Sequence, residues 1–106
     1  MPLSQLQGIG FIRFASAYVQ STGTVSFSND VVSITRTGVG LYQVVLPRTG
    51  YPSTKGFMIG QVQGASMGVV IILDTSDTVK DVAIFDPVVN ANFDADWSFI
   101  ALQVVP

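Results

Sequence analysis

Apolar and polar residues alternate over short stretches along most of the chain, a pattern that predicts β-strands rather than helices. Residues 11–19 form the first such stretch, with Phe14 and Tyr18 on one face and Ala15 and Val19 on the other. Residues that favour strands, such as Val, Ile, Thr and Phe, dominate the sequence, and turn-forming residues recur at short intervals.

A second alternating stretch covers residues 24–28, where Val25 and Phe27 are expected to face the interior. Asn29 and Asp30 follow, and both residue types tolerate the positive φ that tight turns require. We therefore expect a turn directly after this strand.

Residues 31–46 predict a hairpin. Its first strand is expected to place Val32 and Ile34 on one face, and residues 37–40 form its turn. The apolar face of its second strand consists of Tyr42, Val44 and Leu46.

The second half of the chain predicts further strands separated by polar loops. The strands are expected at 57–63, 69–73, 81–85 and 97–105, and the loops at 47–56, 74–80 and 87–96.

Two of these strands differ in pattern. Residues 69–73 show no alternation, which indicates a strand buried on both faces, or one with one face in the core and the other in a subunit contact. Residues 97–105 alternate, so Trp97, Phe99 and Ala101 are expected to face opposite to Ile100, Leu102 and Val104.

The count of about eight short strands predicts an all-β protein. Its architecture is expected to be an antiparallel β-sandwich or a compact jelly roll. The length of 106 residues fits a single domain. We expect that domain to span residues 11–106, and we expect residues 1–10 to form an N-terminal arm that lies on a neighbouring subunit or frays.

Composition indicates that this domain does not stay alone in water. Charged residues make up 11% of the chain, against roughly 25% in an average soluble protein, and apolar residues make up 48%. The mean hydropathy is +0.50. Either the core is unusually rich or apolar surface is covered by other subunits, because interface cores exclude charge.

Composition also excludes several function classes. The chain has no histidine and no cysteine, which excludes catalytic triads based on His, thiolate chemistry and Cys/His zinc sites. The net charge of −2 and the scattered basic residues argue against a nucleic-acid partner. The longest apolar runs are too short for a membrane helix, and no cofactor is indicated.

All seven acidic residues are aspartates, and two close pairs stand out: Asp74 with Asp77, and Asp94 with Asp96. Such pairs could bind calcium, or act as the acid and base of a small carbohydrate-active enzyme, for which Asp74 and Asp94 are the candidates. The calcium-loop spacing is absent, however. We favour the simpler interpretation that these aspartates cap turns.

Tyr51 and Arg48 are the candidate binding residues, because they lie in the polar loop at 47–56, where an exposed aromatic ring could stack on a sugar. Trp97 begins a strand in phase with Phe99, so a packing role is expected for it.

Residues 31–46, VVSITRTGVGLYQVVL, resemble a hairpin found in bacteriophage virion proteins, with the pattern V-x-S-V-x-R-x-G-x-G-x-Y-x-V-x-L. Such small β-domains occur in tail fibres, head fibres and capsid decoration proteins. The resemblance places Gly38 and Gly40 at turn positions and packs Tyr42 against the opposing strand. The turn at Gly23 fits the same setting.

The resemblance and the composition together predict a non-enzymatic capsid decoration (cement) protein. We expect a homo-oligomer, a trimer, that binds the major capsid protein or other virion subunits. The chain would be made in the host cytoplasm, since residues 1–14 do not resemble a secretory signal, and would end in the virion. The alternative is a tail-fibre or head-fibre domain that recognises a host surface glycan.

Overall fold

The computed structural model describes residues 11–47, 56–63 and 68–105 of the chain. In these residues nine β-strands and no helix are present, so none of this part of the chain could cross a membrane as a helix. The strands are β1 (Phe11–Val19), β2 (Val25–Asn29), β3 (Ser33–Gly38), β4 (Leu41–Val45), β5 (Gly56–Val62), β6 (Val69–Asp74), β7 (Val79–Asp86), β8 (Ala91–Asn92) and β9 (Trp97–Val105).

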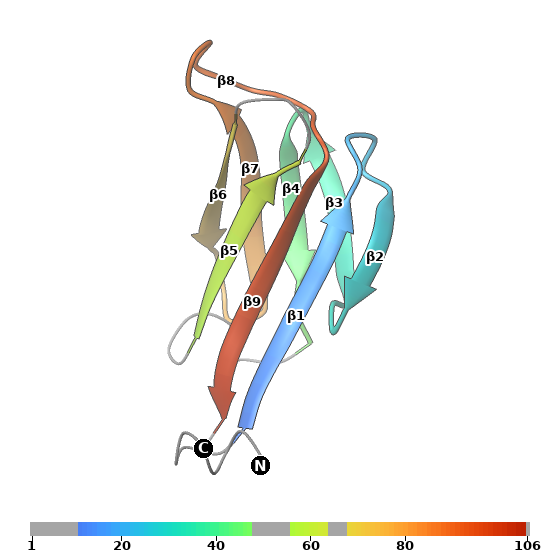
Figure 1. Cartoon of the computed structure of the whole chain (residues 1–106), viewed down its shortest axis with the longest axis vertical. Helices are drawn as coiled ribbons and strands as arrows, with labels where there is room; N and C mark the ends of the chain where they lie inside the picture. Colours follow the sequence, from blue (N-terminus) through green and yellow to red (C-terminus); the bar gives the residue numbers. More distant parts are fainter. Residues whose placement is uncertain (1–10, 48–55, 64–67, 106) are drawn as a thin grey trace.

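The strands form two antiparallel sheets, and the predicted all-β fold is confirmed (Figure 1). Sheet A has the order β2-β1-β9-β5, and sheet B has the order β3-β4-β7-β6, with the short β8 paired to β7. Four hairpins stay within one sheet, namely β1–β2, β3–β4, β6–β7 and β7–β8. The other connections pass between the sheets, which makes the molecule a β-sandwich.

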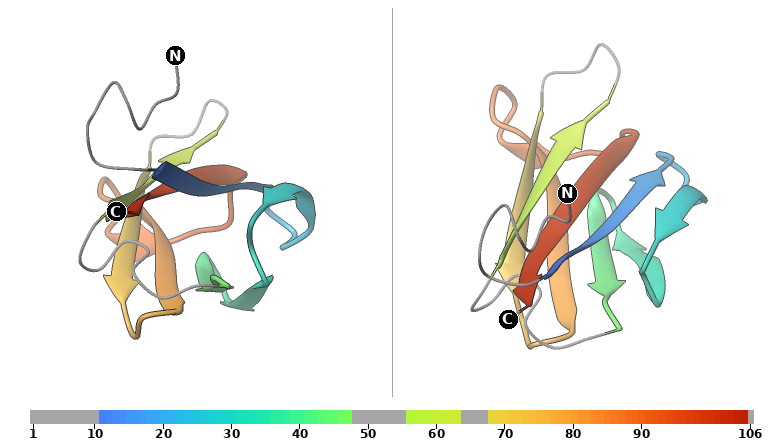
Figure 2. Two further views of the ribbon diagram at one scale, coloured as in Figure 1. Left: turned by 90° about the horizontal axis from the view of Figure 1, so that it is seen from below. Right: turned by 60° about the horizontal axis from the view of Figure 1, so that its bottom comes forward.

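The two sheets stack as separate layers when the molecule is viewed from its end (Figure 2). Between them lies one apolar core, centred on the fully buried Trp97. Its ring packs against Tyr42 of sheet B, with ring centroids 5.1 Å apart, and against Phe99, at 5.7 Å. Trp97 therefore has the packing role expected of it.

The longest pairing, between β1 and β9, forms the middle of sheet A and joins nine residue pairs. Ala15 lies opposite Ala101, and Ala17 lies opposite Phe99. All four side chains are buried, as is Trp97, so the predicted grouping of Trp97, Phe99 and Ala101 on one face is confirmed, and this face points inward. The small alanines leave room for the large rings beside them.

The β3–β4 hairpin forms within the predicted range, and its buried residues Tyr42, Val44 and Leu46 match the predicted face. Tyr42 pairs with Arg36 across the hairpin. Gly40 holds the turn, with a φ of +64°.

Gly40 also has no room for a side chain, because a Cβ atom there would lie 2.5 Å from the carbonyl oxygen of Phe93. Gly38, by contrast, belongs to β3 rather than to the turn, which corrects the expectation for that residue.

Several predictions about individual faces are wrong. Phe27 was expected to face the interior, but it pairs with Tyr18 on the outer face of sheet A and is 59% exposed. Val32 precedes β3 and is 62% exposed instead of sharing a strand face with Ile34.

The Asn29–Asp30 turn is confirmed by the φ of +57° at Asp30.

The loop between β6 and β7 is shorter than the predicted loop at 74–80, because Asp74 is the last residue of β6 and Lys80 already belongs to β7. Strand β6 is not buried on both faces in this chain, since Ile71 and Leu73 are at least half exposed. The loop expected at 87–96 contains the short strand β8. The expected N-terminal arm, residues 1–10, lies outside the described residues.

Candidate interaction surfaces

Asp94 joins the β3–β4 hairpin to the segment that precedes β9. Arg36 donates two hydrogen bonds to its carboxylate, at 2.7 and 3.2 Å, and the backbone N–H of Gly40 donates a third at 2.9 Å. The hydrogen bonds from Arg36 and then from Gly40 lower the pKa of Asp94 below its ordinary value. Asp94 is therefore a structural anion that fixes two loops to each other.

Asp96 has a similar role at the other side of the segment. It accepts hydrogen bonds from the backbone N–H of Ser21, at 2.8 Å, and from the hydroxyl of Tyr18, at 3.3 Å. Burial, and then the nearby charge of Asp96, raise the pKa of Tyr18. Asp96 thus holds the turn after β1, as the turn-capping interpretation predicts.

Lys80 is fully buried on the inner side of β7, which the sequence reasoning missed. Its ammonium forms an ion pair with Asp74 and donates hydrogen bonds to the backbone oxygens of Ser76, at 2.8 Å, and Asp77, at 3.3 Å. Three acceptors satisfy the three N–H groups of a lysine. The cation therefore closes the end of the β6–β7 hairpin from inside.

The two carboxylates suggested for an enzymatic pair do not share a cleft. In the strand register, Asp74 of β6 lies opposite Lys80 of β7, and Lys80 lies opposite Val44 of β4. Asp94, by contrast, accepts a hydrogen bond from the backbone N–H of Gly40. Val44 lies near the end of β4 and Gly40 directly before its start, so the two carboxylates are held at opposite ends of this strand. Among the described residues, no three acidic side chains gather in a way that could hold a metal ion.

The candidate binding residues Tyr51 and Arg48 both lie in the segment 48–55, outside the described residues. The exposed features that the structure does describe are instead the outer faces of the two sheets.

The outer face of sheet A is apolar across three neighbouring strands. Phe14 of β1 and Phe57 of β5 lie on either side of Leu102 of β9, and in the next row Ile59 lies opposite Ile100. These residues form, together with Phe27 of β2, the group that we name face A: Phe14, Phe27, Phe57, Ile59 and Ile100, all between 39% and 59% exposed.

Face A has polar residues at one end and none that are charged within its rows. Ser16 lies between Asn29 and Ile100, and in the following row Tyr18, Ser98 and Gln61 continue from Phe27 on the edge strand β2. An apolar centre with an uncharged polar border is the anatomy of a protein–protein interface.

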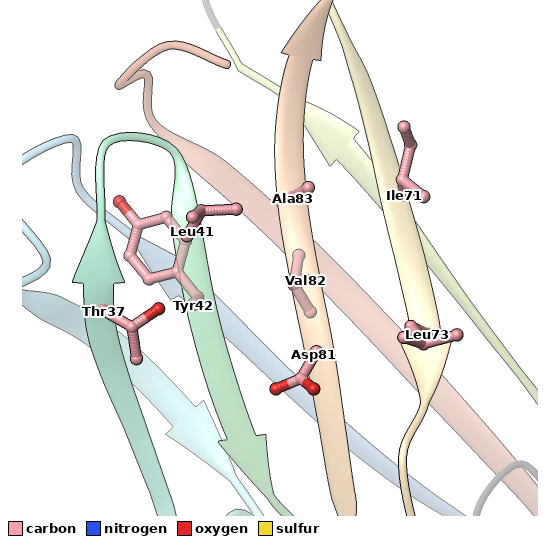
Figure 3. A pocket seen from close by; sticks show the side chains of 8 residues that line it. All are labelled: Thr37, Leu41, Tyr42, Ile71, Leu73, Asp81, Val82 and Ala83. Atoms are coloured by element: carbon pink, nitrogen blue, oxygen red, sulfur yellow. The ribbon is translucent and has the colours of Figure 1, made fainter.

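The outer face of sheet B is also apolar, but it is hollowed and carries a charge. Leu41, Ala83 and Ile71 lie side by side on β4, β7 and β6, and the small Ala83 leaves a hollow between its larger neighbours (Figure 3). The hollow has a volume of about 350 Å³, and the exposed Leu73 and the carboxylate-bearing Asp81 line its other end. We name this surface face B.

Sequence reasoning found these surfaces only in part. It placed Ile100 with Leu102 on a common strand face, but it missed the outward position of Phe27 and the hollow at Ala83. The signal that was present is the excess of apolar residues, which one core cannot absorb.

Comparison of the chain with protein-family models, with curated proteins and with solved structures gave no match. Its function therefore has to be argued from these surfaces.

Proposed function

We propose that this chain is a non-enzymatic structural protein of a virus particle, a capsid decoration protein that stabilises the shell through subunit contacts. One observation carries the proposal: both outer faces of the sandwich are apolar. A lone domain in water gains nothing from two such faces, whereas a subunit placed between other subunits uses both.

The magnitudes favour an oligomer over a single copy. Burying about 500 Å² of apolar surface contributes roughly 12 kcal/mol, and association costs about 4–15 kcal/mol, so one face alone gives a modest net affinity. Copies that associate with each other bind a shell at several points at once, and such multivalent binding greatly strengthens attachment. We accordingly propose a homo-oligomer, a trimer, bound to the major capsid protein.

The resemblance of the β3–β4 hairpin to hairpins of phage virion proteins supports the same proposal. The features that this resemblance singles out have clear structural uses here: Gly40 forms the turn, and Tyr42 packs against Trp97 in the core. They stabilise a small β-domain and need no catalytic residue.

Mass spectrometry of purified virus particles that encode this chain tests the proposal. We expect the chain to remain with the particles at a fixed ratio to the major capsid protein, and to remain with heads after tails are removed. Particles lacking the chain should release their genome at a lower temperature.

Recovery of the chain only among soluble host-cell proteins would contradict the proposal. Recovery with tails instead of heads would support the fibre alternative, and a glycan array would then identify its ligand.

A further inference from the structure

Face A is the surface where this fold exposes most aromatic area. Three of the chain's seven phenylalanines lie on it, each at least half exposed. With about 150–250 Å² of surface per aromatic side chain, these three rings expose roughly 300 Å². Ile59 and Ile100 bring the apolar area of face A to roughly 500 Å².

This area matches the apolar share of a stable self-contact. A standard interface buries about 800 Å² on each partner, and about 65% of a homodimer interface is apolar, which corresponds to roughly 520 Å². The polar border of face A, with Ser16, Tyr18, Ser98 and Gln61, would supply the remaining area.

Charge distinguishes face A from face B as the place where copies meet. Where face A of one copy packs on face A of another, as around a twofold axis, a charge on that face approaches a like charge. Among the described residues, the rows of face A contain no charged side chain, whereas Asp81 lies between Gln43 and Leu73 on face B. Self-association through face B would bring equivalent Asp81 carboxylates together, and face A avoids this cost.

Backbone pairing also makes face A an ordered platform. Its central strand β9 pairs with β1 over nine residues on one side and with β5 over seven on the other. The rows therefore stand on a continuous ladder of hydrogen bonds, and little order has to be gained when another surface is placed on them.

We propose that face A is the surface through which copies of this chain associate with each other. The inference deepens the proposed function, on which it rests for the expectation that copies associate at all, and it leaves face B for the non-identical subunit of the shell.

The experiment measures the mass of the full chain in solution by sedimentation equilibrium. At about 10 µM, above the Kd range of many standard-size interfaces, the wild-type chain should be oligomeric. Ile59→Lys places a charge within face A, on the edge strand β5 beside Ile100, and should weaken association by about 100-fold or more. Leu73→Lys is the matched control, because it places the same charge at an exposed apolar position of an edge strand on face B.

The control should leave the mass unchanged. Near-ultraviolet circular dichroism of the buried Trp97 verifies that both variants keep the fold, and Ile59→Gln, which adds no charge, provides a second variant with a smaller loss of association.

A monomeric wild-type chain, or dissociation by Leu73→Lys with Ile59→Lys unaffected, would overturn the inference. A monomer that still co-purifies with virus heads would refute face A as a self-contact and keep the proposed function. A chain that forms oligomers through face A but is absent from virus particles would support face A as a self-contact and refute the proposed function.

Discussion

At the scale of single residues, Asp94 makes stability depend on pH. Its pKa is lowered in the folded chain, so its ion pair stabilises the fold above the ordinary value of 3.8 and loses this effect as pH falls through the lowered value. We expect the free energy of unfolding to fall between about pH 5 and about pH 2, and to fall less in Asp94→Asn. Urea unfolding at a series of pH values measures this.

The matched control is Asp77→Asn, which removes the same charge from the β6–β7 turn and keeps the contacts of Asp94 with Arg36 and Gly40. If Asp94→Asn kept the full wild-type slope, the pair with Arg36 would not be its source.

Lys80 shows what a linear sequence cannot reveal about one residue. A lysine among Asp, Ser and Thr looks solvated, and only its spacing of two from Val82 places it on the inner side of β7. The carboxylate and carbonyl oxygens that make its burial possible come from the hairpin it closes. Those partners become visible only when β6 and β7 pair.

At the scale of elements, Gly40 fixes the position of the β3–β4 hairpin against the rest of the sandwich. Its backbone oxygen accepts a hydrogen bond from the N–H of Ile84 at 2.7 Å, and its N–H binds Asp94. A Cβ atom there would lie 2.5 Å from the backbone oxygen of Phe93 and 2.8 Å from that of Ile84. These backbone atoms cannot move away without breaking the hydrogen bonds that Ile84 makes with Gly40 and Phe93.

We therefore expect Gly40→Ala to lower the free energy of unfolding by about 3 kcal/mol or more. Gly23→Ala is the comparison, since Gly23 also has a positive φ, +93°, but its Cβ would meet only the Arg36 side chain, at 3.1 Å. This second loss should be about 1–2 kcal/mol. Equal losses in urea unfolding would show that φ alone, and not the packing of the turn, determines the effect.

The elements themselves were largely predictable because short-range alternation determines where strands run. The bounds of β1 and β9 follow from it, and so does the grouping of residues on common faces, such as Ala15 with Val19 and Trp97 with Phe99. Alternation separates two faces without deciding which one is buried, and Phe27 shows the consequence. Its pairing with Tyr18, which no local pattern encodes, turns it outward.

The candidate surfaces depend on strand order, which a single sequence does not contain. Phe14, Ile100 and Phe57 are far apart along the chain, and they meet because β9 lies between β1 and β5. Hydropathy predicted that apolar surface would remain uncovered, and the sheet order shows where it gathers.

At the scale of the whole molecule, the inference that face A joins copies has a thermodynamic signature. The face has no charged row, so salt has little to screen, and we expect the dissociation constant to change less than about threefold between about 0.05 and 0.5 M salt. Burial of roughly 500 Å² of apolar surface on each copy, with a polar border, should give a heat-capacity change of about −0.3 kcal/mol/K.

Calorimetric dilution of the oligomer at several temperatures and salt concentrations measures both quantities. A contact made through the Asp81 side of the sandwich would respond differently, because added salt would strengthen it by screening like charges. A strong salt dependence together with a heat-capacity change near zero would mean that copies meet through polar surface. Because face B is apolar as well, copies would then meet through neither face, and the inference for face A would be wrong.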